Sequence, residues 1–214
     1  MCIRDRIMTT LGECGMLVCD DDELWKSAWA YKDHGKGYDT VYDGVEHDGV
    51  SFRWLHDSFG TNWRMTEVQA AQGRVALAKV PRWVESRRAN AAVLNEGIEG
   101  IAGLSVVEEP EYAHGAFYKY YALVDTERLV AEWSRDRIAL AVRAEGVPCG
   151  VGACPDISRE RAFVDAGLAP FRRLDGAASL GSRSIMLTLH PTCTDAEMRD
   201  AVAALAKVMG EAVR

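Results

Sequence analysis

The segment from Asn62 to Thr66, with the sequence NWRMT, carries two side chains whose chemistry suits an anionic ligand. The planar guanidinium of Arg64 presents a fork of N–H donors that matches a carboxylate or a phosphate. Asn62 offers an amide donor, and asparagine is also common where a chain turns. Two structural explanations therefore stay open: Asn62 turns the chain ahead of a helix, and Arg64 forms a salt bridge with Glu67 or another neighbour.

Histidines and cysteines do not have the spacing of a metal site. His47 and His56 lie near three aspartates, Asp43, Asp48 and Asp57, but this spacing fits no known mechanism of metal binding. The six cysteines include no CxxC pair and no zinc-type spacing with histidine. We therefore expect no metal, and reduced thiols in a cytoplasmic protein.

Composition describes an ordinary folded protein. The chain has 214 residues, of which 48% are apolar, and a formal net charge of −7. The acidic balance disfavours nucleic acid as a partner, because nucleic-acid binders normally carry a basic stripe. No segment approaches the roughly 20 apolar residues of a membrane span, and the N-terminus has no apolar signal region. We therefore expect neither nucleic acid nor a membrane as partner.

The first part of the chain combines short ordered segments with a long irregular one. The apolar run Leu17–Cys19 predicts a short buried strand. The acidic residues from Asp22 open a helix, where the helix dipole favours negative charge. Residues 34–61 are rich in Gly, Asp, His and aromatic side chains and show no sustained period, which is typical of a functional or mobile loop.

Hydroxyl side chains mark the starts of three later helices. Thr66 with Gln69, and Thr194 with Glu197, form capping boxes, and Ser134 forms a simple cap. The expected helices are 66–81, about 81–95, 134–144 and a last helix from 195. The expected strands lie at 104–107, 117–124 and 184–190, and residues 147–154 are expected to be a strand followed by a loop. From position 104 the order β, β, α, β, α, β, α predicts a small mixed αβ layer.

Five segments in order resemble the second half of the sugar aminotransferases of the DegT/DnrJ/EryC1/StrS family. They are RIMTTLGECGMLVCDDDELW, KDHGK, SFGTNWRMTEVQAAQGRVAL, GVPCGV and LTLHPTCTDAEM. The resemblance covers essentially the whole chain from Ile7, and its most specific stretch is NWRMTE followed by QAA. The family consists of enzymes that use pyridoxal 5′-phosphate (PLP) on the fold-type-I scaffold.

The resemblance implies an α/β fold class: the C-terminal part of a fold-type-I PLP-dependent transferase. Residues 1–66 would then be a remnant of the large PLP-binding domain, including an active-site and dimer loop. Residues 67–100 would be connecting helices, and residues 101–214 a small C-terminal αβ domain.

The resemblance places Arg6 where the family has the lysine that forms the Schiff base with PLP. A guanidinium stays protonated and is a poor nucleophile, so Arg6 is not competent for this role. Two explanations stay open, a natural inactive fragment and an incomplete gene model. We prefer the second, because the hexapeptide MCIRDR resembles a sequence that recurs at broken ends of open reading frames in environmental assemblies. Ile7 would then be the first authentic residue.

The resemblance also implies roles at the cofactor. In the family two subunits build each active site, and the asparagine that corresponds to Asn62 reaches the phosphate of the neighbour's PLP. Arg64 would bind a carboxylate or phosphate, such as that of the donor glutamate. The hydroxyls of Thr9 and Thr10 would bond the Schiff-base region or the phosphate, or would only satisfy the turn.

Two histidines are candidates for the substrate side of the site. His34 lies in a segment similar to the family's R-x-H-G sequence near the active-site mouth, and His190 ends a strand where the family often has an aromatic residue or histidine. For His34, a bond to the loop backbone is an equally open explanation.

The expected parent enzyme is therefore a homodimer with a shared active site that moves an amino group from glutamate to a keto-sugar nucleotide. This chain is expected to be inactive as it stands. One alternative is a non-catalytic dimerisation partner of a full-length aminotransferase. Another is a PLP-dependent sugar dehydratase, but those members replace the lysine with histidine, which Arg6 does not match.

Overall fold

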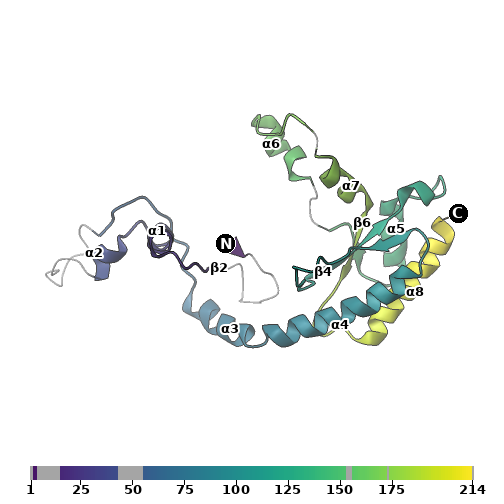
Figure 1. Ribbon diagram of the computed structural model, residues 1–214, viewed down its shortest axis with the longest axis horizontal. Helices are drawn as coiled ribbons and strands as arrows, with labels where there is room; N and C mark the ends of the chain where they lie inside the picture. The colour runs from purple at the N-terminus through teal and green to yellow at the C-terminus, as the bar shows by residue number, and fades with distance from the viewer. Residues whose placement is uncertain (1, 4–14, 43–54, 153–155, 173, 214) are drawn as a thin grey trace. The chain divides into compact units, whose positions relative to one another are not determined.

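The computed structural model describes residues 2–3, 15–42, 55–152, 156–172 and 174–213, and its contacts divide the chain into two compact units (Figure 1). The first unit is Met1–Val80 and the second is Pro81–Arg214. This division falls inside the segment 67–100 that the sequence predicts as connecting helices. The domain limits at 66 and 100 concern the intact protein and stay predictions.

The first unit contains short elements joined by long connections. They are β1 (Cys2–Ile3), which pairs antiparallel with β2 (Met16–Leu17), then α1 (Asp22–Lys32), α2 (Tyr38–Tyr42) and α3 (Glu67–Leu77). The predicted capping box of α3 is confirmed: Thr66 accepts from the Gln69 N–H, and the Gln69 side chain accepts from the Thr66 N–H. These two bonds satisfy backbone donors that the first turn of a helix leaves free.

The predicted buried strand at Leu17–Cys19 is wrong in its limits and in its burial. The observed strand β2 covers Met16–Leu17, and these two side chains are 65% and 41% exposed. The next residue, Val18, is 70% exposed. An apolar run is buried only where a second layer covers it, and the described part of this unit places no such layer over β2.

The predicted irregular segment 34–61 contains the short helix α2, which the sequence did not reveal. Tyr38 of this helix packs edge-on against Trp25 and Trp29 of α1, with ring centroids 4.8 and 5.3 Å apart. Lys26 of α1 also pairs with Asp39 of α2 at 2.8 Å. The contacts with α1 therefore hold α2 in place. The sequence of α2 has no helical periodicity of its own that would predict it.

The second unit forms, within its described residues, an antiparallel sheet of four strands in the order β3-β4-β6-β5. The strands are β3 (Leu104–Val106), β4 (Lys119–Val124), β5 (Cys149–Gly150) and β6 (Ser184–Thr188). The helices are α4 (Val80–Glu99), α5 (Arg135–Ala144), α6 (Arg161–Asp165), α7 (Asp175–Arg183) and α8 (Asp195–Ala212), with short 3-10 turns η1 (Thr126–Arg128) and η2 (Ile157–Arg159). The predicted order of strands and helices is confirmed, with α6 and α7 in place of one expected helix.

One face of this sheet carries the core. Along β4, the buried residues Tyr120, Ala122 and Val124 alternate with half-buried ones, as the period of a strand requires. Ile185 and Leu187 of β6 lie opposite Ala122 and Tyr120 and continue the buried face. Three helices supply the facing layer through Leu94, Ile98, Ile138, Val142, Leu205 and Met209.

Helices α4 and α8 run side by side in the second unit (Figure 1) and are in close contact at Gly97. A Cβ atom at this position would lie 2.5 Å from one methyl group of Val202 and 2.6 Å from the other. The valine side chain is branched at Cβ and stiff, so it cannot move aside easily. Asn90, about two turns before Gly97 on α4, donates to the backbone carbonyl of Cys193 at 3.0 Å just before α8 begins.

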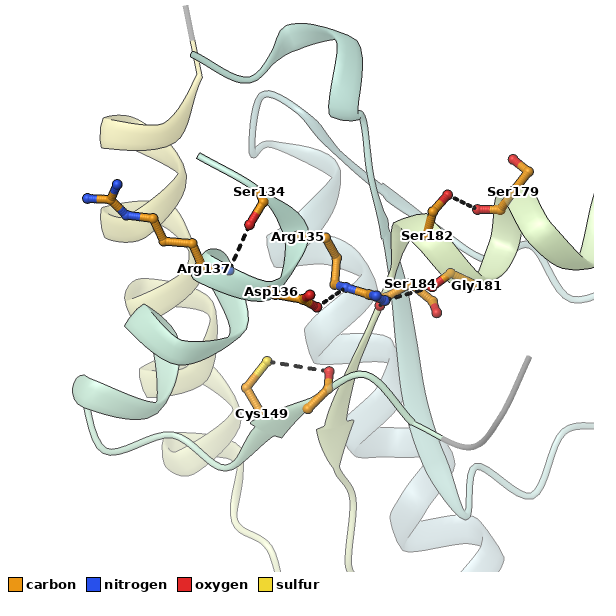
Figure 2. A network of polar contacts seen from close by, with 10 residues as sticks. Ser134, Arg135, Asp136, Arg137, Cys149, Ser179, Gly181, Ser182 and Ser184 are labelled. Atoms are coloured by element: carbon orange, nitrogen blue, oxygen red, sulfur yellow. Dashed lines mark hydrogen bonds and ion pairs between the residues drawn. The ribbon is translucent and has the colours of Figure 1, made fainter. Parts of the chain in front are cut away.

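Arg135, the first residue of α5, joins this helix to the junction of α7 and β6. Figure 2 shows its guanidinium reaching the carbonyl oxygens of Gly181 and Ser184, which accept from Nη1 at 2.8 Å each. Asp136 accepts from Nε at 2.7 Å. Ser134 caps the same helix by accepting from the backbone N–H of Arg137, as the sequence predicts.

Truncating Leu205, which is fully buried in α8, is expected to destabilise the second unit. Leu205→Ala removes apolar contacts and leaves a cavity, so we expect a loss of about 3 kcal/mol in the free energy of unfolding. Urea denaturation followed by far-UV circular dichroism measures it. The matched control is Leu140→Ala in α5, a leucine that is 62% exposed, which should change stability by no more than about 0.5 kcal/mol. Equal effects of the two substitutions would contradict the described core.

Candidate functional site

Two segments of the first unit, 31–37 and 55–63, lie side by side and carry two of the predicted site residues, His34 and Asn62, with Arg64 directly after the second segment. Antiparallel bridges pair Asp33 with Asn62 and Lys36 with His56. The backbone hydrogen bonds between the segments include those from His34 N–H to Thr61 O (2.8 Å), from Thr61 N–H to Tyr31 O (2.7 Å), and from Trp63 N–H to Lys32 O (2.9 Å). We call this arrangement the paired segments.

Glycine is required where the paired segments touch. Gly35 has a φ of +82°, and a Cβ atom on it would collide with the carbonyl oxygen of Ser58. A Cβ atom on Gly60 would collide with the backbone of Gly35 and lie 2.8 Å from the carbonyl carbon of His34. His34 itself has a φ of +63°, a conformation that non-glycine residues rarely adopt. The local backbone is therefore held in place by its neighbours and not by its own preference.

A buried carboxylate lies at the centre of the paired segments. Asp33 is only 8% exposed, and its Oδ1 atom lies near three nitrogen atoms of basic side chains. Lys36 Nζ is 3.5 Å away, Arg64 Nε is 3.6 Å away, and His34 Nε2 is 3.9 Å away. Buried charges are tolerated when they are paired, and Asp33 fulfils this condition.

Arg64 links this carboxylate to Asn62. Its Nε–H donates to the Asn62 Oδ1 atom at 3.1 Å. Because arginine has donors only, the oxygen of the Asn62 amide must face Arg64, and the NH₂ end is left to donate elsewhere. Asn62 is exposed, so this donor can reach a ligand.

The charge state of Asp33 follows from its surroundings. Burial by itself raises the pKa of this carboxyl, but the ammonium of Lys36 and the guanidinium of Arg64 outweigh burial. The pKa therefore lies below the ordinary aspartate value, and Asp33 is ionised at neutral pH. A fixed negative charge thus holds the two cations in place.

A cavity of about 960 Å³ opens beside the paired segments within the first unit. Its walls are mostly apolar and aromatic, and two cationic groups, those of Lys32 and Arg64, lie among them. Trp25, Trp29 and Trp63 contribute aromatic surface. A planar ring with an anionic substituent matches such a lining, because apolar walls receive the ring and a few polar groups fix its orientation.

The structure brings together three of the residues that the sequence singles out. Asn62, Arg64 and His34 all lie around Asp33, and the salt bridge considered for Arg64, to Glu67 or another neighbour, is formed with Asp33. Thr66, and not Asn62, caps the following helix.

The other predicted residues are not part of this cluster. His190 lies in the second unit, where its Nδ1 atom is 2.8 Å from Thr192 Oγ1. Arg6, Thr9 and Thr10 lie outside the described residues. Their roles therefore stay predictions.

Asp33 is the site residue that sequence analysis missed. An aspartate between Lys32 and Lys36 suggests only a local ion pair, whereas the structure adds a contact with Arg64 from a distant segment. The close approach of the segments at glycine positions was the available signal, since Gly35 and Gly60 flank the two halves of the site.

Two kinds of feature are absent from the described part of the chain. No group of three or more His, Cys, Asp or Glu side chains there is arranged to hold a metal ion. No helix among the same residues is both long enough and apolar enough to cross a membrane.

Comparison with known proteins identifies relatives of nearly the whole chain. A profile of the DegT/DnrJ/EryC1/StrS aminotransferase family matches residues 5–206. The solved aminotransferase from Psychrobacter cryohalolentis is 43% identical, with a TM-score of 0.88, over 96% of this chain and 54% of that one. These matches confirm the resemblance and the predicted fold class.

Two more distant relatives extend the comparison. The L-glutamine:2-deoxy-scyllo-inosose aminotransferase of Micromonospora echinospora is 26% identical over 93% of this chain and 50% of its own length. The E. coli GDP-4-keto-6-deoxy-D-mannose-3-dehydratase, solved with bound hydrated PLP, shares the fold at 19% identity and a TM-score of 0.72, over 88% of this chain and 49% of that one. The chain thus spans about half the length of the relatives it matches.

Replacing Gly35 by alanine is expected to disrupt the paired segments. Gly35→Ala places a Cβ atom at positive φ and against the Ser58 carbonyl, so we expect a loss of at least about 2 kcal/mol. Urea denaturation followed by tryptophan fluorescence measures the change. Gly15→Ala is the control, because a Cβ atom at Gly15 meets nothing within 4 Å. A Gly35→Ala variant as stable as the Gly15→Ala variant would exclude the described backbone.

Acid is expected to remove the contribution of Asp33 to stability. Its pKa is lower in the folded chain than in the unfolded chain, where aspartate has a pKa of about 3.9. The ionised carboxylate therefore stabilises the fold above about pH 4, and this contribution is lost as the pH falls through the lower, folded-state pKa. The stability difference between the wild type and Asp33→Asn, measured by urea denaturation, should shrink in this acid range. A difference that stays constant or grows on acidification would contradict the ion pairs.

Proposed function

We propose that this chain, which belongs to the DegT/DnrJ/EryC1/StrS aminotransferase family, is part of an enzyme that transfers an amino group to a keto-sugar nucleotide. The observation that carries the proposal is the ordered Asn62–Arg64 pair beside an aromatic cavity, within a chain 43% identical to a solved aminotransferase. Glutamate is the proposed amino donor, and the product would serve amino-sugar or glycan biosynthesis. Residues 1–66 would belong to the large domain, and residues 101–214 would form the small one.

The residues present fit one part of PLP, its phosphate side. The NH₂ group of Asn62 has no acceptor among the described residues, and a guanidinium lies 3.1 Å from the same amide. An amide donor and a planar cation are the kind of groups that bind phosphate oxygens. When bound, PLP supplies an electron sink for the carbon that carries the transferred amino group.

Individual residues would then share the work as follows. Asn62 would donate to the phosphate group, and Arg64 would attract the phosphate or the carboxylate of the donor. Thr9 and Thr10 would add hydroxyl donors near the same group. His34 and His190 are the proposed candidates for contact with the sugar substrate.

The residue at position 6 bears on whether this chain could take part in amino-group transfer. The family has a lysine there, which carries the proton between substrate and cofactor, whereas a guanidinium stays protonated at neutral pH and cannot accept a proton as a base. We therefore propose that the chain with Arg6 does not transfer amino groups. The proposed assembly is a homodimer in which Asn62 reaches the site of the partner subunit. A non-catalytic partner role is the second candidate, and Arg6 favours it.

A chimera tests the proposed function. The first half of the Psychrobacter cryohalolentis aminotransferase is joined to residues 7–214 of this chain, with lysine at position 6. We expect this protein to bind PLP and to convert a nucleotide keto-sugar into its amino form, detected by mass spectrometry, with glutamate or glutamine as donor. The same chimera with arginine at position 6 is the matched control and should form no product.

Asn62→Ala in the active chimera separates the phosphate role from the chemistry. Loss of a hydrogen bond to a charged group should weaken PLP binding by roughly tenfold or more, while saturating PLP should restore most of the activity. A chimera with lysine that retains PLP but transfers no amino group from either donor would refute the proposed function.

A further inference from the structure

Asp33 is the least exposed member of the cluster that it forms with Arg64 and Asn62. Its side chain is 12% exposed, whereas that of Arg64 is 49% exposed. The contact between them is an ion pair of 3.6 Å, longer than a hydrogen bond. The one hydrogen atom on Arg64 Nε is instead directed to Asn62, at 3.1 Å.

The contacts link three groups in series: the Asp33 carboxylate, the Arg64 guanidinium and the Asn62 amide. The Asp33 carboxylate holds the Arg64 guanidinium by its charge, and the guanidinium holds the oxygen of the Asn62 amide by a hydrogen bond. The backbone supports the same order, because Asp33 and Asn62 are bridge partners in the paired segments. An amide held by its oxygen can rotate only by breaking this bond, so its NH₂ end keeps one orientation.

We propose that Asp33 is a positioning residue: it fixes Arg64 so that Asn62 presents its amide NH₂ group to a phosphate monoester. This inference rests on the proposed function, since it assumes that Asn62 meets the phosphate group of the ligand. It adds that the affinity for phosphate depends on a buried residue that does not touch the ligand.

The direction in which Asp33→Asn changes the affinity for phosphate distinguishes a positioning role from a simple effect of charge. Asp33 is negative, so its removal should strengthen the binding of an anion if only long-range charge matters. Positioning predicts the opposite, because Asp33→Asn releases the guanidinium and with it the amide. The substitution keeps the size of the side chain, so the buried space is still filled.

The experiment titrates the intact 214-residue chain, labelled with ¹⁵N, and follows the side-chain amide of Asn62 by NMR. The probes are pyridoxal 5′-phosphate, inorganic phosphate, and pyridoxal without phosphate. In the wild type both phosphate probes should shift the Asn62 amide, and pyridoxal should not. Asp33→Asn should weaken the binding of both phosphate probes by about threefold to tenfold, as expected for the loss of one well-oriented hydrogen bond.

Three further variants complete the design. Asp39→Asn removes the same charge from the same unit, at an exposed ion pair with Lys26, and should change phosphate affinity by less than about twofold. Arg64→Lys keeps the charge but lacks the Nε–H donor, and should weaken binding as Asp33→Asn does. Asp33→Asn combined with Arg64→Lys should be no weaker than the single variants, because both act through one arrangement.

The outcomes distinguish this inference from the proposed function. If the wild type shows the phosphate-dependent shift but Asp33→Asn binds equally or more tightly, the positioning role is wrong and the phosphate role of Asn62 stands. If pyridoxal shifts Asn62 as much as the phosphate probes, or if no probe shifts it, Asn62 of this chain does not select phosphate and the positioning role is wrong, whereas the chimera tests the proposed function independently. If Asp33→Asn fails to fold, Arg64→Lys decides: wild-type affinity in that variant overturns the arrangement.

Discussion

Segments 31–37 and 55–63 approach so closely that side chains are excluded at Gly35 and Gly60, and the rest of the first unit depends on this approach. The contact brings the backbone of Asp33 beside that of Asn62 and buries the aspartate carboxylate. Burial in turn makes the carboxylate an effective partner for cations, because charges interact more strongly away from water. A constraint on backbone distance thus determines the electrostatics of the site.

The cations around Asp33 are only partly neutralised. One carboxylate faces the ammonium of Lys36 and the guanidinium of Arg64, which leaves a surplus of one positive charge. Lys32 adds a further cation at the adjacent cavity. The chain as a whole carries a net charge of −7, so this region differs in sign from the average of the molecule. A local surplus of this kind attracts a small anion to one place and leaves the remaining surface unattractive to it.

The parts of the fold that sequence patterns predicted are those that local chemistry determines. The caps at Thr66, Ser134 and Thr194 involve partners three residues away, and all three are present. The alternation along β4 likewise reflects the period of a strand. The capping residues and the strand period could be read because each depends on neighbours along the chain.

The parts that the sequence did not reveal depend on distant partners. Helix α2 exists because Tyr38 meets two tryptophans of another helix, and Asp33 matters because Arg64 arrives from a different segment. The exposure of β2 likewise depends on whether another layer covers it, which cannot be predicted from an apolar run alone. At the site, residue types could be predicted from the motif, but their mutual arrangement could not.

The contact between Gly97 and Val202 has a consequence for how this fold can vary. Two helices meet there with no spare volume, so each residue defines the space that the other is allowed. A larger side chain at position 97 of α4 is compatible with this packing only if the side chain at position 202 of α8 becomes smaller. We therefore expect the residues at positions 97 and 202 to covary among homologous proteins. Their combined side-chain volume would reflect the spacing of these helices.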